Sequence, residues 1–239
     1  MIFLDKVYGQ HDVADLVILE LIASPAFQRL RGICQKGLQG EYTRFDHSLG
    51  TMLLLRMLGA TLEEQVAGLT HDVSHTAFSH LVDLITGTAQ KDDLQDRTHA
   101  TFIRDRTGFV EIVKRYGLPE VCVLEPHRHG LLERPIPELC ADRVDYTLRD
   151  CAALGFKNVV ETCVPALIAH KGKIIFNSRH AALVFWQAYY TKENRESTPQ
   201  FMAPYELLAD AFRRAFKIGA MGLNTCTRRI NMLLKDCGV

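Results

Sequence analysis

Apolar side chains recur at intervals of three and four residues along most of this chain, and that spacing limits the fold more than any other feature. It is clear at residues 12–22, 62–73 and 137–154. Such spacing places the apolar side chains on one face of an α-helix, which can then pack on a core. Two β-prone runs flank Lys171-Gly172-Lys173 and predict one small hairpin. We therefore expect an all-α helical bundle with a minor β-hairpin near residues 164–176.

Capping residues predict where several helices begin. Asp46 or Ser48 is expected to cap a helix that continues through residues 51–58. Thr61 and Glu64 have the spacing of a capping box for the helix at 62–73. Further helices are predicted at residues 74–85, 98–106, 110–116, 179–190 and 205–235, with a polar break at 191–200.

Length and composition are those of an ordinary globular protein. The 239 residues are 47% hydrophobic and 23% charged, which is enough apolar material for a core. No repeat, linker or low-complexity tract divides the chain, so we expect a single domain over residues 1–239. The 28 basic side chains balance the 28 acidic ones. Because sequence-independent binding to nucleic acid needs a basic excess, a nucleic-acid partner is not expected.

The cysteines and apolar segments bear on the compartment. Seven cysteines are scattered singly, without a C-x-x-C pair, which argues against a disulfide scaffold or a cysteine-type zinc site. The first residues lack the pattern of a signal peptide. No apolar run approaches the roughly 18 residues of a membrane span, so no membrane partner is expected. These features together predict a cytoplasmic protein with reduced thiols.

Histidines and aspartates are concentrated in one part of the sequence. His71 and Asp72 are adjacent, His75 follows four residues after His71, and His47 and His80 lie on either side. If the helix continues, His71 and His75 share a face. Imidazole and carboxylate groups at this density suit a divalent metal. The alternative is a set of histidines that cap helices or fill the core.

A second group lies on the helix predicted at 137–154. Asp142, Tyr146 and Asp150 are spaced four residues apart and form one stripe. Aspartate is unfavourable inside helices, so several of them indicate another role. The alternative is a solvated face with ion pairs such as Asp145 with Arg149. A third candidate is Arg44, whose charge so close to His47 would suit a bound phosphate.

Taken together, these segments resemble the HD-domain phosphohydrolases, and most closely the branch of the deoxynucleoside triphosphate triphosphohydrolases. That pattern is a helical histidine, then an adjacent His-Asp, then a distant aspartate, all binding one metal. The matching residues are His47 in RFDHSLGT, His71 and Asp72 in AGLTHDVSHTAFSH, and Asp142 in ADRVDYTLRD. The order and flanks match over residues 5–155, which would form the HD core, with a C-terminal helical extension at 177–239.

The resemblance implies roles for individual residues and a divalent metal, which could be Mn, Fe, Zn, Mg, Co or Ni. The metal ligands would be His47, His71, Asp72 and Asp142. Arg44 would hold a phosphate. Histidines that match positions near the phosphates or in catalysis are His75, His80 and His99. Residues that would surround the deoxyribose are Gln35, Tyr146 and Asp150.

The function expected from the resemblance is metal-dependent hydrolysis of a (deoxy)nucleotide, most closely of a deoxynucleoside triphosphate. Other activities of the superfamily stay open, namely a nucleoside monophosphate phosphatase or a pyrophosphohydrolase. A two-metal oxygenase or phosphodiesterase is also open, because His99 with His127 or His129 could supply further ligands. A non-enzymatic nucleotide-binding module is the remaining class. The partner would be a nucleotide or another phosphorylated small molecule, and a homo-oligomer is possible.

Overall fold

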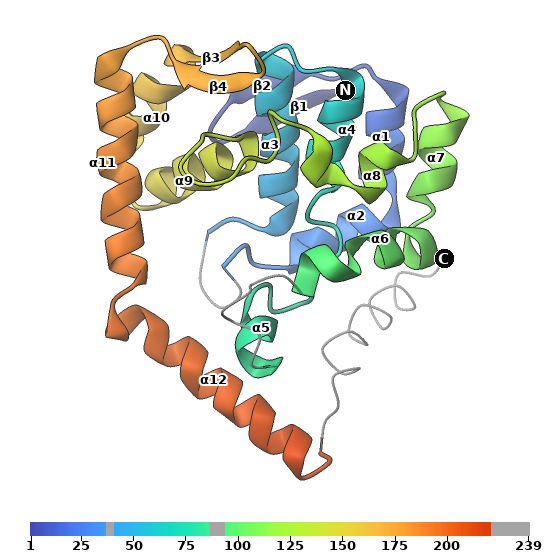
Figure 1. The fold of residues 1–239 in the computed structure, drawn as a ribbon, viewed down its shortest axis with the longest axis vertical. Coiled ribbons are helices and arrows are strands. Elements are labelled where there is room, and N and C mark those ends of the chain that lie inside the picture. Colours follow the sequence, from blue (N-terminus) through green and yellow to red (C-terminus); the bar gives the residue numbers. More distant parts are fainter. Residues whose placement is uncertain (37–40, 87–93, 221–239) are drawn as a thin grey trace.

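A computed structural model describes residues 1–36, 41–86 and 94–220 of the chain, and this part is mainly helical (Figure 1). The fold class expected from the sequence is confirmed. The helices are α1 (Leu16–Ala23), α2 (Pro25–Gln28), α3 (Arg44–Met57), α4 (Leu62–Thr70), α5 (Leu81–Thr86), α6 (Leu94–Arg106), α7 (Phe109–Arg115), α8 (Val121–Leu124), α9 (Ala141–Ala153), α10 (Lys157–Cys163), α11 (Arg179–Glu196) and α12 (Pro199–Lys217), with 3₁₀ turns η1 (Arg29–Gly32), η2 (Pro126–Arg128) and η3 (Val164–Ala166).

Two antiparallel hairpins accompany the helices. Strands β3 (Leu167–His170) and β4 (Lys173–Phe176) form the hairpin that the sequence predicted. Strands β1 (Ile2–Asp5) and β2 (Gly9–Asp12) form a second one, which was not predicted. Its side chains are mostly exposed, so the strands lack an apolar alternation that would reveal them. The turn of this first hairpin is closed by the Asp5 carboxylate.

Helix α3 stands in the middle of the molecule and packs against α4 and α9 (Figure 1). Its leucines, Leu53 to Leu55, are buried in the main core together with Leu148 of α9. The helix begins at Arg44 because Thr43 forms a capping box with Asp46. The expected caps, Asp46 or Ser48, are therefore wrong. The earlier start places Arg44 and His47 in the first turn of the helix.

Helix α4 begins after the predicted cap Thr61, but it ends at Thr70. The side-chain oxygen Oε1 of Glu64 accepts a hydrogen bond from the backbone N–H of Leu131, at 2.7 Å. The helix predicted at 74–85 is wrong, because residues 71–80 form a series of turns and α5 begins only at Leu81.

Arg29 gives the physical reason for these turns. Its buried guanidinium donates to the backbone carbonyl of His75 at 2.9 Å and to that of Val73. Carbonyls bonded in this way are drawn toward a side chain that is 44 or more residues away in sequence. Helical periodicity carries no information about such a distant donor. His71 and His75 consequently do not share one continuous helix.

The C-terminal helices differ from expectation at their junction. Helix α11 continues to Glu196 and α12 starts at Pro199, so the polar break is much shorter than residues 191–200. Helix α12 packs on α5 through Tyr205, Ala209 and Phe212. The end of the predicted extension, residues 221–239, lies outside the described residues. None of the described helices combines the length and apolarity that crossing a membrane requires.

Candidate active site

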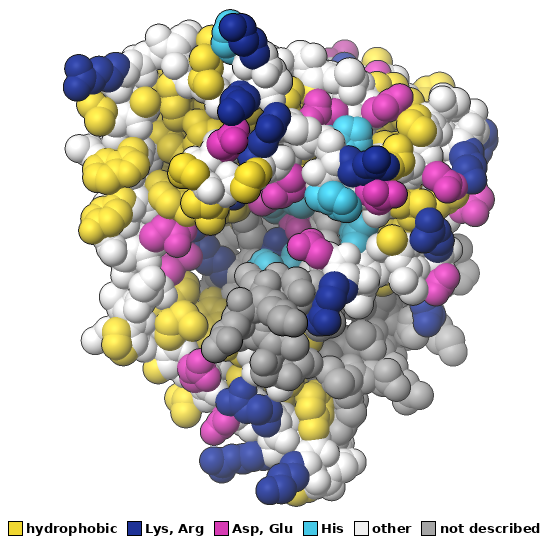
Figure 2. All heavy atoms as spheres, in the orientation of Figure 1, with side chains coloured by type: hydrophobic (Ala, Val, Ile, Leu, Met, Phe, Trp, Pro, Cys, Tyr) yellow, Lys and Arg dark blue, Asp and Glu magenta, His cyan; other side chains and the backbone are white. Residues whose placement is uncertain are grey.

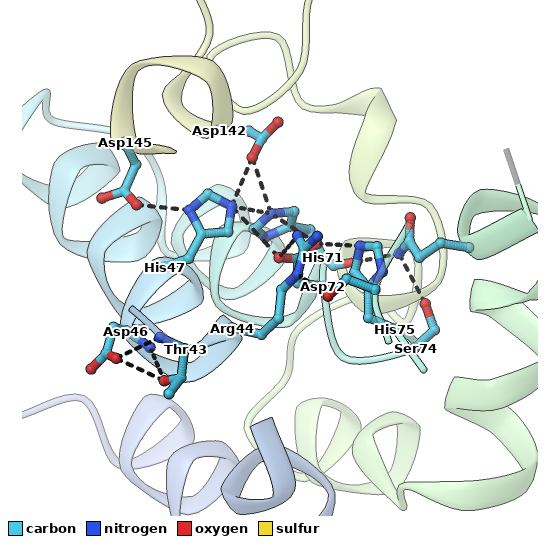
Figure 3. A network of polar contacts seen from close by, with 12 residues as sticks. Thr43, Arg44, Asp46, His47, His71, Asp72, Ser74, His75, Asp142 and Asp145 are labelled. Atoms are coloured by element: carbon cyan, nitrogen blue, oxygen red, sulfur yellow. Dashed lines mark hydrogen bonds and ion pairs between the residues drawn. The ribbon is translucent and has the colours of Figure 1, made fainter. Parts of the chain in front are cut away.

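Three separate elements bring four predicted metal ligands together (Figure 3). His47 comes from the first turn of α3, His71 and Asp72 from the turn that directly follows α4, and Asp142 from the first turn of α9. The Nε2 atom of His47 lies 2.8 Å from Asp142 Oδ1 and 3.3 Å from His71 Nε2. His71 Nε2 lies 3.5 Å from the same Asp142 oxygen. Their donor atoms therefore converge on one point.

This arrangement fits a divalent cation. Ligand atoms of His47, His71 and Asp142 all lie within 4.8 Å of one another. Metal–ligand bonds of about 2.0–2.2 Å place neighbouring donors at comparable separations. The oxygens of Asp72 lie 3.6 Å from His47 Nε2 and 3.5 Å from His71 Nε2, so Asp72 can complete the set. Two imidazoles and two carboxylates are an ordinary donor set for Mn, Fe or Zn.

The electrostatics also favour positive charge at this point. Burial alone would lower the pKa of His47, but hydrogen bonds with Asp142 and Asp145 outweigh it and raise the pKa to about 10. Burial would raise the pKa of Asp142, but His47 and His71 hold it well below its usual range. Without metal, His47 therefore holds a proton at the point where a cation would bind. Metal binding would displace this proton, as it does whenever imidazole becomes a ligand.

The outer nitrogens of both histidine ligands have protein partners. His47 Nδ1 lies 2.7 Å from Asp145 Oδ2, and His71 Nδ1 lies 2.8 Å from the backbone oxygen of Gly68. Such contacts fix the orientation of the ring and leave Nε2 for the metal. The sequence suggested an ion pair of Asp145 with Arg149, which is present at 2.7 Å. It did not reveal the contact of Asp145 with His47, because residues 98 positions apart carry no spacing signal.

Arg44 lies beside the metal ligands. Its Nη1 donates to Asp72 Oδ2 at 2.6 Å and its Nε donates to Ser79 Oγ at 3.2 Å. Burial would raise the pKa of Asp72, but Arg44 and the neighbouring histidines keep it well below its usual range. The guanidinium is thus held against the carboxylate at the edge of the pocket. Its role in holding a phosphate stays a prediction.

The three predicted catalytic histidines have different surroundings. His75 is buried with Nε2 at 3.1 Å from Asp72 Oδ1, and burial together with Arg44 lowers its pKa to about 3. The exposed ring of His80 packs edge-on against His75, with ring centres 4.9 Å apart. His99 is buried between Ser74 Oγ at 3.0 Å and the backbone oxygen of Val123 at 2.9 Å. Of the three, only His80 is exposed to solvent.

The buried His99 should make stability depend on pH. Burial lowers its pKa from 6.5 to about 4, although the hydrogen bond with the backbone oxygen of Val123 acts in the opposite direction. The unfolded chain therefore binds a proton that the folded chain does not between these values, and stability falls as pH drops from 6.5 toward 4. We expect the free energy of unfolding of the metal-free parent to lose about 3 kcal/mol relative to His99→Gln between pH 7 and pH 4. Urea titrations of both proteins with excess chelator measure this, and parallel pH curves would contradict it.

Every predicted site residue lines one pocket, which has a volume of about 760 Å³. Figure 2 shows histidine and acidic side chains gathered around a hollow in the face of the molecule. Gln35, Tyr146 and Asp150 line this pocket together with the four metal ligands, Arg44 and the three histidines. Gln35 is held near the start of α3 by the bridge between Cys34 and Thr43. The structure thus brings together all the positions that the resemblance singled out.

The pocket is also lined by charged residues that the sequence did not indicate. Lys36 lies 3.0 Å from Asp150 and also pairs with Glu196. Lys192 lies 3.5 Å from Asp150 and 4.5 Å from the ring centre of Tyr146. These residues come from α11 and from the loop after η1, far apart in sequence. Lys192 also lay in the predicted polar break, so no helical spacing connected it with the site.

Within the described parts of the chain, one group of side chains brings three or more metal-binding atoms close enough to share an ion: His47, His71 and Asp142. His99, a proposed ligand of a second metal, has protein partners at both ring nitrogens. The described residues therefore offer geometric support for one metal, and not for a second one held by His99 with His127 or His129.

Comparisons with known proteins agree with this geometry. A model of the HD domain matches residues 44–150. The uncharacterized protein YdhJ of Bacillus subtilis is 40% identical over 227 residues, which cover 89% of this chain and 68% of that protein. The chain belongs to the HD-domain family of metal-dependent phosphohydrolases. The metal-dependent phosphohydrolase cns2 of Cordyceps militaris is 34% identical, over 84% of this HD-domain chain and 62% of cns2.

More distant relatives extend the comparison. The human deoxynucleoside triphosphate triphosphohydrolase SAMHD1 is 28% identical over 64% of this HD-domain chain and 33% of its own length. A solved phosphohydrolase from Bacteroides thetaiotaomicron superposes with a TM-score of 0.67 at 20% identity, covering 91% of this chain and 59% of that one. This last likeness shows the fold. The HD-domain chain spans about two thirds of the length of YdhJ and cns2.

Proposed function

We propose that this HD-domain enzyme hydrolyses a phosphoester of a deoxynucleotide, with a deoxynucleoside triphosphate as the first candidate. One observation carries the proposal. The metal ligands, Arg44 and the three residues expected around a deoxyribose, Gln35, Tyr146 and Asp150, line the same pocket. Its volume of about 760 Å³ is that of a site for a small molecule. The likeness to SAMHD1 supports the same substrate class.

Each group of residues in the pocket would have a different role in the hydrolysis. A divalent cation bound at His47, His71, Asp72 and Asp142 would polarise a phosphoryl oxygen and lower the pKa of a bound water toward about 7. Arg44, beside Asp72, would orient the phosphate. His80 is exposed in the pocket and would give a proton to the leaving oxygen. His75, close behind His80, would keep that ring in place.

The charge of the pocket favours a second candidate, a nucleoside monophosphate. The described lining contains seven carboxylates and three lysines or arginines, namely Asp72, Asp83, Asp96, Glu125, Asp142, Asp150 and Glu196 against Lys36, Arg44 and Lys192. It also contains Glu133, whose pKa is raised to about 8 by burial and by Asp142. Both lysines are already paired with Asp150 or Glu196. A triphosphate would need more cationic partners than one phosphate does. The monophosphate therefore belongs in every substrate test.

A panel of substrates tests both candidates. Deoxynucleoside mono- and triphosphates would be incubated with the purified enzyme and Mn, Mg, Zn, Co or Fe, and the products separated by chromatography. Release of triphosphate supports the first candidate, and release of orthophosphate from the monophosphates alone supports the second. Tight nucleotide binding without any product after long incubation would contradict both and favour a binding module.

The sugar is expected to be selected by Tyr146. If its ring packs against the 2′ carbon while Gln35 and Asp150 bond the 3′-hydroxyl, a 2′-hydroxyl has neither space nor a partner. The loss is about 1–3 kcal/mol, or roughly 10–100-fold in kcat/KM. We therefore expect deoxynucleotides to outperform matched ribonucleotides, and Tyr146→Ala to narrow the gap. Equal kcat/KM values for the two sugars in the parent enzyme would overturn this role.

A further inference from the structure

The N-terminal hairpin is joined to the metal site by a line of buried polar contacts. Asp5, at the end of β1, uses its two oxygens differently. Oδ1 accepts from the backbone nitrogens of Val7 and Tyr8 at 2.8 and 2.9 Å and so closes the turn. Oδ2 accepts from Arg149 Nη2 at 2.7 Å. The fold of the hairpin therefore fixes the carboxylate that faces Arg149.

Arg149 connects Asp5 to His47 through a further carboxylate, that of Asp145. Its Nε donates to Asp145 Oδ2 at 2.7 Å, and the same oxygen lies 2.7 Å from His47 Nδ1. The side chains of Asp145 and Arg149 are 0% and 1% exposed. A single guanidinium thus spans two carboxylates, one from the hairpin and one behind a metal ligand. In so buried a place each of these charges needs its partner.

Helix α3 is shaped to admit this arginine. A Cβ atom at Gly50 would lie 1.7 Å from Arg149 Nη2 and 2.3 Å from Asp145 Oδ1. The absence of a side chain at Gly50, one turn after His47, is what allows the guanidinium to reach both carboxylates. The rings of Tyr8 and Tyr42 flank it, with their centres 5.9 and 5.4 Å from its central carbon.

We infer that the β1–β2 hairpin is a positioning element of the metal site, and that Asp5 acts on His47 through Arg149 and Asp145. This inference rests on the proposed metal ligands. Asp5 holds Arg149, which holds Asp145 in the orientation that accepts the Nδ1 proton of His47. That proton fixes the ring so that Nε2 faces the metal. Partners of this kind raise the basicity of a histidine ligand and change the affinity of the site for the metal.

Substitution of aspartate by asparagine tests the inference without removing the turn. In Asp5→Asn, the amide oxygen can still accept from Val7 and Tyr8, while the amide nitrogen meets Arg149. The affinity for Zn²⁺ would be measured by competition with a chromophoric chelator. We expect Asp145→Asn to weaken it by about 10–100-fold, the usual range for partners of metal ligands. Asp5→Asn should weaken it by a smaller factor that the titration resolves.

Asp12→Asn is the matched control, because Asp12 lies in the same hairpin and pairs with the N-terminal amine at an exposed position. Its Zn²⁺ affinity should equal that of the parent. Parent affinity in Asp5→Asn would overturn the inference, as would an equal loss in Asp12→Asn. Failure of the parent to bind Zn²⁺ would instead overturn the metal site itself, so the two failures are distinguishable.

A measurement on the unaltered protein covers the case in which a variant does not fold. In the Zn²⁺-loaded parent labelled with ¹⁵N, the ring signals of His47 should show a proton on Nδ1 that exchanges slowly with solvent, and a metal on Nε2. An unprotonated Nδ1, or coordination through Nδ1, would overturn the proposed line of contacts.

Discussion

Replacement of His71 or Asp142 by alanine should leave the purified protein without bound metal. His71 Nε2 and Asp142 Oδ1 lie within 3.5 Å of each other and of His47 Nε2, at the point where three elements meet. Removal of a ligand should cost more affinity than the roughly 10–100-fold typical of the partners behind ligands. Phosphohydrolase activity should fall to background, because the remaining residues cannot supply the chemistry of the cation.

Elemental analysis after dialysis against trace-metal-free buffer measures this result. His180→Ala and Asp105→Ala are matched controls, because both side chains are exposed and lie outside the pocket. Their metal content should equal that of the parent. Equal metal in the parent, His71→Ala and Asp142→Ala would show that the ion is bound elsewhere.

Arg149→Met should destabilise the protein far more than the loss of an exposed arginine does. The substitution keeps much of the side-chain volume but leaves Asp5 and Asp145 buried with their shared cation removed. Breaking a buried pair by removing one partner costs about 3–5 kcal/mol. Arg115→Met is the control, because Arg115 pairs with Glu20 at a position that is 59% exposed. An exposed pair contributes only about 0–1 kcal/mol.

Urea unfolding of the metal-free proteins, followed by circular dichroism, measures both changes. Excess chelator keeps metal binding from contributing to the difference in the free energy of unfolding. A loss in Arg149→Met no larger than that in Arg115→Met would mean that the buried carboxylates do not depend on the arginine.

The candidate site residues were singled out by the resemblance to the HD-domain phosphohydrolases, and helical periodicity indicated only which of them lie on or next to helices. His47 and Asp142 each occupy the first turn of a helix, and His71 directly follows the end of α4. That these residues would lie close together was an expectation from the resemblance to the HD-domain phosphohydrolases, and their spacing along the chain did not show it. The hairpin at β3 and β4 was predicted for a local reason, since Lys171 and Gly172 form a turn between two β-prone runs.

The features that were not predicted depend on contacts between distant residues. The turns after His71 follow from the bonds of Arg29 to carbonyls more than 40 positions away. The place of Lys192 beside Tyr146 depends on how α11 packs on α9. The contact of Asp145 with His47 requires the packing of α3 on α9. Local periodicity contains no information on any of these.

Hydrolysis of a nucleotide phosphoester by this HD-domain chain is proposed to depend on a metal held by His47, His71, Asp72 and Asp142. The most direct test measures product release by the parent and by Asp142→Ala, first after removal of metal with a chelator and then after return of each divalent metal. We expect the parent to lose activity without metal and to regain it with at least one ion, and Asp142→Ala to stay inactive throughout. Undiminished hydrolysis by the metal-free parent, or by Asp142→Ala, would contradict the proposal.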